Sequence, residues 1–450
     1  MTLIELDRDA PLDPEPPRRT PPPWRYRHLG LILSAALAMT PGGAALPGGT
    51  FWRHLGLIPA SAGTDAPIQL AGGRLFTVVS SGQERTLTAW ALKPEPYRMW
   101  SAALPVSADY DPVSGIFGPV SVRAAGGVLL VTDGPGPTTA LDPENGRVRW
   151  TSAGRVTTAG DTAFTVDRIF RPGTLYDQES GDPGMLYFSA DGQPHTEPPE
   201  RTEVRGLDLG TGETLWTSSS PGSVTADPVA GSPRAVLVTA SERLTLLDAA
   251  TGRVLREKPL RQVDGTGPST ASVLGDLALV GYQGVNVQLG YDARTLERRW
   301  KRSITDDPAP ADCTGLLCSR DKAEVSVVDP VSGEPKWFVP AEMSLSARAG
   351  YVLLASAETG APRHLVDPVT AAPLVNLKGW TAPVDGTSDR VLLLRRYERD
   401  GGQTFGVVLA GEPEVKVLGL ADVHGGVCGG DDRYVVCRDT GGLRVWAYRA

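Results

Sequence analysis

The sequence predicts an all-β protein: a β-propeller of eight four-stranded blades, preceded by one N-terminal transmembrane or signal helix. Three observations lead to this fold class. Glycine (52) and proline (39) together make roughly a fifth of the 450 residues and separate short apolar runs, which is typical of strands joined by turns. An eleven-residue window recurs along the chain, and an apolar run precedes its copies. Units of about 35 to 45 residues with this content are typical of propeller blades.

Composition and charge exclude some classes of function. A hydrophobic content of 41% and a charged content of 21% are those of a globular protein with a sizeable core. The net charge is -8, and no basic stripe occurs. Because phosphate binding needs clustered lysine and arginine, no nucleic-acid partner is expected.

The first 46 residues contain a tail and an apolar segment. Residues 1–28 are acidic, then proline-rich and basic, which predicts a disordered cytoplasmic tail. Residues 29–46 (LGLILSAALAMTPGGAAL) carry no charge over about 18 residues, the minimum for a helix that crosses a membrane. Four arginines precede this segment: Arg18, Arg19, Arg25 and Arg27. The positive-inside rule therefore predicts a single-pass protein of the cell membrane with its propeller outside the cytoplasm.

Two other interpretations of the apolar segment stay open. Leu29 to Ala38 has the length of a signal-peptide core, and Ala36-Leu37-Ala38 resembles a cleavage site, so the protein would be secreted after cleavage. The second is a cytoplasmic protein with an apolar N-terminal segment. No cysteine follows the segment directly, which excludes a lipid-anchored cysteine.

The recurring window is clearest at residues 140–150 (ALDPENGRVRW). Five further copies align with it: 206–216 (GLDLGTGETLW), 246–256 (LLDAATGRVLR), 290–300 (GYDARTLERRW), 327–337 (VVDPVSGEPKW) and 365–375 (LVDPVTAAPLV). Two degenerate copies keep the apolar ends but lose the central aspartate and glycine: 90–100 (WALKPEPYRMW) and 407–417 (VVLAGEPEVKV). The eight copies predict eight blades.

Each window predicts a β-hairpin. An aspartate opens the turn and accepts hydrogen bonds from turn amides: Asp142, Asp208, Asp248, Asp292, Asp329 and Asp367. A glycine supplies the left-handed backbone position: Gly146, Gly212, Gly252 and Gly333. A tryptophan at the end is expected to pack between neighbouring blades rather than to stack on a ligand: Trp100, Trp150, Trp216, Trp300 and Trp337.

Further apolar runs complete the blades. One precedes each of six windows, at residues 73–79, 127–132, 234–239, 276–281, 351–355 and 390–394, and a short inner strand before each run gives four strands per blade. After the eighth window, residues 432–437 and 443–448 form surplus strands. We expect them to close the ring with residues 51–58, since an unpaired edge would invite aggregation. Residues 47–66 are thus a linker with a ring-closing strand, and residues 67–450 are the propeller.

The four cysteines form two close pairs, Cys313 with Cys318 and Cys428 with Cys437. Both spacings suit neighbouring strands joined by a short turn, so we predict two local disulfides in an oxidising compartment, although four cysteines allow three connectivities. A metal site is the alternative. Zinc sites usually have two-residue cysteine spacings and histidine partners, whereas the five histidines here are dispersed, so no metal site is predicted.

Residues 206–216 and 246–252 match the signature A-x-D-x-x-T-G-x-x-x-W. On these residues the sequence resembles the pyrroloquinoline-quinone-like (PQQ-like, quinoprotein-type) β-propeller repeat family over about residues 60–450. The resemblance implies eight blades, and the family contains both quinone enzymes and non-catalytic scaffolds. The architecture is also similar to the propeller scaffold of outer-membrane protein assembly, but the lipid-anchor cysteine is missing, so that role does not carry over.

The resemblance allows a PQQ-dependent dehydrogenase as an alternative function. That chemistry needs the quinone, a Ca²⁺ ion that polarises it and a carboxylate base. The sequence lacks the adjacent cysteine pair of many such enzymes and a C-x-x-C-H motif, and no ligand trio or base can be placed. Common hydrolase and nucleotide-binding motifs are also missing. We therefore predict no catalytic residues and no cofactor.

One segment departs from the repeat, residues 168–205, which is long for a loop in a compact domain. Its candidate binding residues are Tyr176, Asp177, Glu179, Asp182 and His195. The three acids suit a Ca²⁺ site, the whole loop suits a protein partner, and a tolerated insertion without function is the third alternative. We expect a membrane-tethered, non-catalytic scaffold that binds a ligand or another envelope protein. A ligand-sensing ectodomain of a membrane signalling system is a further alternative.

Overall fold

The computed structural model describes residues 51–59, 68–81, 84–104, 120–133, 136–177, 179–181, 185–190, 192–231, 234–304, 311–386, 390–399, 401–424 and 426–450. The tail predicted at 1–28 and the apolar segment at 29–46 lie outside these residues. Within them, no helix is long and apolar enough to cross a membrane.

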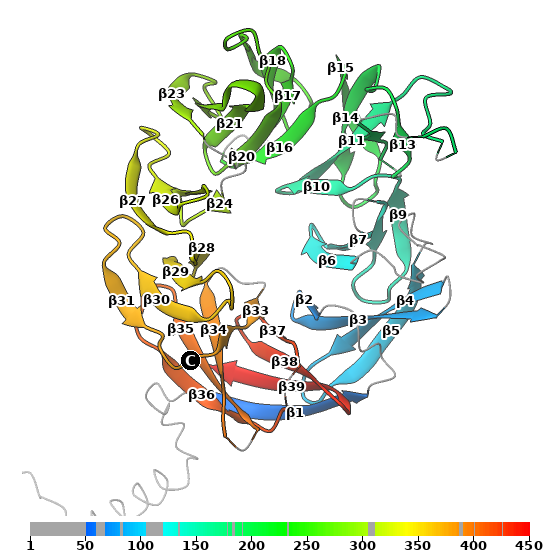
Figure 1. The fold of residues 1–450 in the computed structure, drawn as a ribbon. Helices are drawn as coiled ribbons and strands as arrows, with labels where there is room; N and C mark the ends of the chain where they lie inside the picture. The colour runs from blue at the N-terminus through cyan, green and yellow to red at the C-terminus, as the bar shows by residue number, and fades with distance from the viewer. Residues whose placement is uncertain are drawn as a thin grey trace, which may run out of the picture. The chain divides into compact units, whose positions relative to one another are not determined.

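The described strands of the unit Thr50–Ala450 form nine sheets of four or five strands, arranged around a common axis as propeller blades (Figure 1). We number the sheets one to nine in chain order. Sheet one contains β2 (Gln69–Ala71), β3 (Arg74–Ser81), β4 (Glu84–Ala91) and β5 (Tyr97–Leu104). Sheet two contains β6 (Val120–Ala125), β7 (Val128–Asp133), β8 (Thr138–Leu141) and β9 (Val148–Ser152). Sheet three contains β10 (Val156–Ala159), β11 (Thr162–Ile169), β14 (Arg201–Asp208) and β15 (Thr214–Pro221).

The next three sheets repeat this order. Sheet four contains β16 (Thr225–Val229), β17 (Ala235–Ala240), β18 (Arg243–Asp248) and β19 (Val254–Pro259). Sheet five contains β20 (Thr270–Leu274), β21 (Leu277–Tyr282), β22 (Val287–Asp292) and β23 (Arg298–Ser303), with the 3₁₀ turn η2 (Gln283–Val285). Sheet six contains β24 (Ala311–Asp312), β25 (Leu317–Arg320), β26 (Glu324–Val328) and β27 (Pro335–Pro340).

The last three sheets bring the two ends of this unit together. Sheet seven contains β28 (Met343–Arg348), β29 (Tyr351–Ser356), β30 (Pro362–Val366) and β31 (Pro373–Asn376). Sheet eight contains β32 (Ala382–Pro383), β34 (Val391–Tyr397), β35 (Gln403–Leu409) and β36 (Lys416–Ala421). Sheet nine contains β33 (Asp385–Gly386), β37 (Cys428–Gly430), β38 (Tyr434–Asp439), β39 (Gly442–Arg449) and β1 (Phe51–Pro59).

The prediction of eight blades was wrong, because the strands after the eighth window build a ninth sheet. The outermost strand of this sheet is β1, which pairs antiparallel with β39 from Phe51 opposite Arg449 to Pro59 opposite Gly442. A hairpin window needs two strands that are adjacent in sequence. Since β1 and β39 come from opposite ends of the chain, the ninth sheet leaves no window in the sequence.

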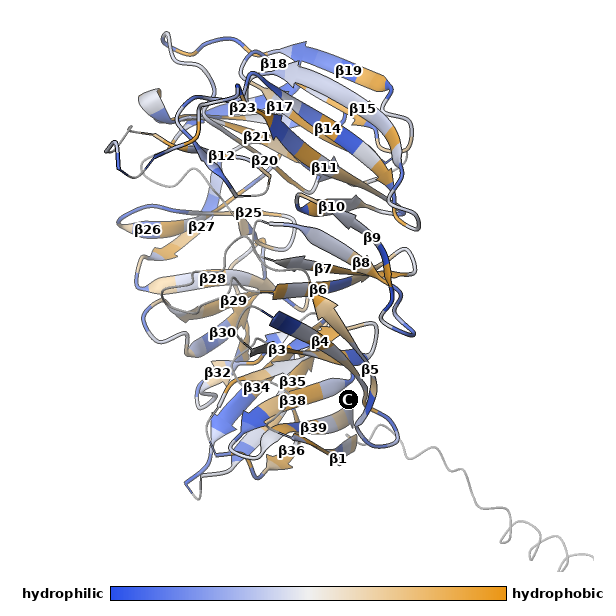
Figure 2. Cartoon of the chain, turned by 90° about the vertical axis from the view of Figure 1, so that its right-hand side faces the viewer, coloured by the Kyte–Doolittle hydropathy of each residue, from blue (hydrophilic) through white to orange (hydrophobic). Residues whose placement is uncertain are grey.

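The core is divided among the interfaces between sheets. Side chains alternate between the two faces of each strand, and Figure 2 shows hydrophobic and hydrophilic residues interspersed along β14. The described residues form nine hydrophobic clusters, one at each interface between neighbouring sheets. The cluster between sheets nine and one contains Ile58, Leu75 and Val436, all fully buried. The ring is therefore closed by packing as well as by strand pairing.

Both predicted disulfides are confirmed. Cys313 and Cys318 are joined across the turn between β24 and β25, and Cys428 and Cys437 are joined where β37 and β38 pair. All four cysteines are buried. Disulfides persist in oxidising compartments, so they indicate an extracytoplasmic location.

Candidate functional site

The aspartate side chains of the repeat accept hydrogen bonds from backbone amides of their own turns. The Asp208 carboxylate accepts hydrogen bonds from the amides of Gly210 (2.9 Å) and Thr211 (2.8 Å) and from the Thr211 hydroxyl (3.1 Å). The bonds from Thr211 lower the pKa of Asp208. Two turn amides also donate to each of four other aspartates: Asp248, Asp292, Asp329 and Asp367. In the window at residues 140–150, the Asp142 carboxylate accepts a hydrogen bond from one turn amide and pairs with Arg149 at 2.8 Å. These carboxylates form the hairpins and do not line a site.

The tryptophans of the repeat join one sheet to the next. Each indole N–H donates to the carbonyl of the residue that follows the turn aspartate, or its counterpart, in the next sheet. The bonds are Trp100 to Pro143 (3.0 Å), Trp150 to Leu209 (2.9 Å), Trp216 to Ala249 (3.0 Å), Trp300 to Pro330 (2.9 Å) and Trp337 to Pro368 (2.9 Å). The ring of Trp150 also covers Gly212, where a Cβ atom would lie 2.5 Å from the indole. The indole faces are therefore covered by protein.

The segment that departs from the repeat is shorter than predicted. Strands β11 and β14 extend into it, which leaves residues 170–200 between them, and we call these residues the insertion. It contains the small hairpin of β12 (Tyr187–Phe188) and β13 (Pro194–His195). Ile169 pairs with Arg201, whereas Thr162 pairs with Asp208, so the insertion leaves sheet three at the end opposite its aspartate turn.

His195 belongs to the core of the insertion. Its ring stacks on Phe170 with 3.7 Å between the ring centroids, and its Nδ1 lies 3.0 Å from the Thr174 hydroxyl. Only 9% of the side chain is exposed. The amide of Tyr176 donates to the Pro194 carbonyl at 3.1 Å, which ties the two sides of the insertion together. His195 thus holds the insertion in shape.

The predicted acidic residues do not form a metal site in the described part of the chain. The Asp177 carboxylate accepts the amide of Glu179 at 2.9 Å, which makes it part of a local turn. Asp182 lies outside the described residues. No group of three or more histidine, cysteine or acidic side chains in the described part of the chain could hold a metal ion. A Ca²⁺ site that includes Asp182 stays a prediction.

The insertion presents apolar side chains to solvent. Leu175, Met185 and Phe188 are 56%, 71% and 50% exposed. Arg168 donates to the Phe188 carbonyl (3.1 Å), which joins the insertion to β11, and Arg171 pairs with Glu200 (3.3 Å) within the insertion.

A cavity of about 590 Å³ opens at the same end of the sheets. Gly222 lines it and donates its amide to the Glu200 carbonyl (3.1 Å), which places the cavity beside the insertion. Its charged lining residues are two acids and two bases: Glu242, Glu257, Arg243 and Lys258. We call the insertion together with this cavity the insertion face.

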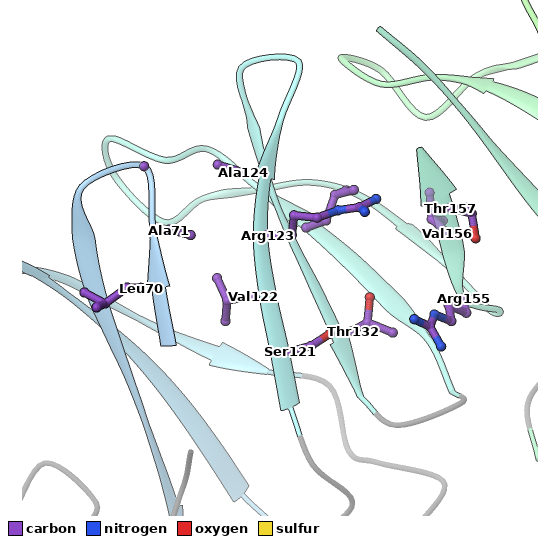
Figure 3. A pocket seen from close by; sticks show the side chains of 12 residues that line it. Leu70, Ala71, Ser121, Val122, Arg123, Ala124, Thr132, Arg155, Val156 and Thr157 are labelled. Carbon is purple, nitrogen blue, oxygen red and sulfur yellow. The ribbon is translucent and has the colours of Figure 1, made fainter. Parts of the chain in front are cut away.

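A second cavity, of about 500 Å³, lies between the inner strands of sheets one, two and three (Figure 3). Among its twelve lining residues are two arginines, Arg123 and Arg155, and no acid. Both side chains extend into the space between β6 and β10 (Figure 3). Burial and the like charge of Arg155 lower the pKa of Arg123. No local sequence pattern indicates this pair, because the two arginines line one cavity only when the sheets converge at the axis.

The fold is a β-propeller, and comparison with known proteins identifies its repeats. Residues 200–316 match the family model described as outer membrane protein assembly factor BamB. Within these residues lie the windows at 206–216, 246–256 and 290–300, so this part of the chain has PQQ-like β-propeller repeats, as predicted. No curated protein sequence matches the chain significantly.

Solved structures similar to this chain have diverse functions. BamB from Moraxella catarrhalis is 14% identical, with 88% of this chain and 98% of that chain covered and a TM-score of 0.40. A europium-containing methanol dehydrogenase is 12% identical, with 87% and 85% covered and a TM-score of 0.39. A eukaryotic initiation factor is 10% identical, with 83% and 95% covered and a TM-score of 0.49. At this level of similarity, function does not transfer from any of them.

Proposed function

We propose that the protein is a non-catalytic, extracytoplasmic scaffold that binds another envelope protein through its insertion face. The observation that carries this proposal is the exposure of Leu175, Met185 and Phe188 on a hydrogen-bonded frame. A contiguous patch of exposed apolar side chains marks an interaction surface, and we propose that these three side chains of one insertion form such a patch. The matched family is described as an outer membrane protein assembly factor, which supports a protein partner for this chain.

The neighbouring cavity gives the insertion face the composition of an interface. Interfaces combine an apolar centre with a polar, solvent-accessible rim. Here Met185 and Phe188 would supply the centre, and the charged residues around the cavity, among them Glu242 and Lys258, would supply the rim. Because these charges are of both signs, we expect the partner surface to be mixed rather than strongly acidic or basic.

Crosslinking in native membranes tests the proposal. We expect Met185→Asp with Phe188→Asp to abolish the crosslink to a specific partner, because buried aromatic and apolar anchors dominate binding energy. Phe338→Asp is the matched control, since Phe338 is 66% exposed on β27, on a different sheet. Capture of the same partner by the double variant, or no partner with the unaltered protein, would contradict the proposal.

The proposal also includes tethering by residues 29–46. The two disulfides support an extracytoplasmic propeller with either an anchor or a cleaved signal peptide. Mass spectrometry of the N-terminus decides between them. An intact N-terminus in the membrane fraction supports the anchor, whereas a mature protein that begins near residue 39 shows secretion.

The non-catalytic part of the proposal has a direct test. Purified protein is incubated with PQQ and Ca²⁺, and dye-linked oxidation of alcohols and sugars is followed together with the melting temperature. We expect neither oxidation nor a rise in melting temperature. Turnover would instead assign the quinone dehydrogenase activity that the repeat family allows.

A further inference from the structure

We propose that Arg123 and Arg155 form a binding site for a small anionic ligand that carries carboxylate or phosphate groups. The site is the cavity of about 500 Å³ between the inner strands β2, β6 and β10 (Figure 3). None of its lining residues belongs to the insertion face, so the proposal does not depend on the scaffold function.

The charge of this cavity is not balanced by the described residues. Elsewhere in the propeller, exposed arginines pair with acids, as Arg149 does with Asp142 (2.8 Å) and Arg234 with Asp161 (2.6 Å). The contact of Arg123 is instead with a neutral hydroxyl, that of Thr158, at 2.5 Å. A guanidinium has five N–H donors, so most of those at Arg123 point to no protein acceptor in the described part of the chain.

Bringing two guanidinium groups into one cavity has an electrostatic cost. Two like charges repel, and because both arginines are exposed, solvent screens part of this repulsion. Arg155 follows the outer strand β9 and precedes β10, whereas Arg123 lies on β6, so their proximity is a consequence of the fold of sheets two and three. A bound anion would offset the remaining repulsion and accept hydrogen bonds from both guanidinium groups.

The walls of the cavity are fixed before any ligand arrives. The side-chain amide of Gln69 on β2 donates to the Val120 carbonyl (3.1 Å) and accepts the Val122 amide (3.3 Å), both on β6. The Thr138 hydroxyl accepts the amide of Val156 at 3.0 Å, which holds β10. Because these bonds connect three sheets, little ordering free energy is needed on binding.

The lining defines the class of ligand. Guanidinium groups recognise carboxylates and phosphates through paired N–H donors. The volume lies within the range of small-molecule sites, about 300 to 1,000 Å³. Leu70, Val122 and Val156 line the same space and offer contact to a short carbon skeleton. The lining therefore suits an anionic ligand, with or without a short carbon skeleton.

Calorimetric titration of the full-length protein at low ionic strength tests the site, with inorganic phosphate and succinate as separate probes. We expect at least one probe to bind. Arg123→Gln and Arg155→Gln should each weaken binding by about 10- to 100-fold, since a charge-assisted hydrogen bond is lost, and the double variant should abolish it. Arg256→Gln, at an exposed arginine on β19, is the control and should leave binding unchanged.

The outcomes separate the possible ligands. Tighter binding of phosphate assigns a phosphate ligand, and tighter binding of succinate assigns a carboxylate. Melting temperatures of the variants without probe must match that of the unaltered protein, so that a loss of binding is not a loss of folding. The proposal is overturned if neither probe binds, if the double variant binds as well as the unaltered protein, or if only an acidic peptide binds.

Discussion

Four of the five tryptophans of the repeat fit against a glycine of the following sheet, and this contact explains why both residues recur in the window. The fifth, Trp337, faces the window of sheet seven, which has Ala371 at that position. The glycine at position seven has a positive φ, 75° at Gly212, which an L-residue adopts at a cost. It also leaves room for the indole ring, here that of Trp150. Backbone conformation and packing between sheets therefore both favour glycine at this position, although Ala371 holds it in sheet seven with a φ of 60°.

One window shows what happens without the tryptophan. The window of sheet four ends in Arg256 instead, and the following sheet has Leu296 where four other windows have glycine. Leu296 keeps the positive φ (58°) but is only 1% exposed, because its side chain packs in the cluster between sheets four and five. The leucine thus fills the space that an indole occupies at other interfaces.

We predict that Gly212→Ala destabilises the protein by about 3 kcal/mol, through a strained backbone and a clash with Trp150. Gly222→Ala separates the two effects, since Gly222 has a similar φ (68°) but open space where the Cβ would lie. For this control we expect only about 1 kcal/mol. Denaturant unfolding measures both, and equal losses would mean that the contact with Trp150 contributes nothing.

The buried carboxyl group of Asp227 is expected to make the free energy of unfolding depend on pH. Burial raises the pKa of Asp227, on β16, to about 6. Its carboxyl has no hydrogen bond or ion pair with any other described residue. Because the folded protein then binds a proton more tightly than the unfolded chain, this residue favours folding at low pH. Its favourable effect is lost as the pH rises from about 4 to about 6.

We therefore predict that Asp227→Asn raises the free energy of unfolding by roughly 1 to 2 kcal/mol at pH 7.5, a value reduced for partial solvent screening. At pH 4 the variant and the unaltered protein should be equally stable. Thermal unfolding between these pH values measures the difference. Asp264→Asn, at an exposed aspartate, is the control, and a difference at Asp227 that does not depend on pH would contradict the assigned pKa.

At the scale of elements, the hairpins were predictable and the inner cavity was not. A hairpin such as residues 206–216 contains its turn aspartate, its glycine and its tryptophan within eleven residues, so its sequence is sufficient to define it. Arg123 and Arg155 are on separate sheets, and only the curvature of the ring brings them together. No local sequence pattern around either arginine predicts that the two side chains share a cavity.

The insertion lies between these two cases. Its position was predictable, because a long segment without the repeat interrupts sheet three. The role of His195 was not, since stacking on Phe170 and bonding to Thr174 depend on how residues 170–200 fold back on themselves. A histidine in a long loop suggests chemistry, whereas here the ring is buried inside the loop and stabilises it.

At the scale of the whole molecule, the ring depends on one strand from the beginning of the described chain. Strand β1 forms the outer edge of sheet nine and contributes to two of the nine interfaces. Trp52 stacks on Phe405 and Trp446, with 5.4 Å and 5.8 Å between ring centroids, and donates to the Leu420 carbonyl at 3.1 Å. Ile58, fully buried, packs toward sheet one. The prediction of eight blades missed the sheet that contains this strand, because β1 pairs with a strand from the opposite end of the chain.

This arrangement predicts different effects for two neighbouring truncations. A protein that begins at residue 50 keeps β1, and we expect its melting temperature to equal that of the full chain. A protein that begins at residue 61 exposes the edge of β39 and the clusters around Trp446 and Leu75, so it should aggregate or melt at a much lower temperature. A synthetic peptide of residues 50–60 should restore part of the loss by pairing with β39. Thermal unfolding and size-exclusion chromatography measure these outcomes, and a stable monomer without β1 would show that sheets one to eight suffice for the ring.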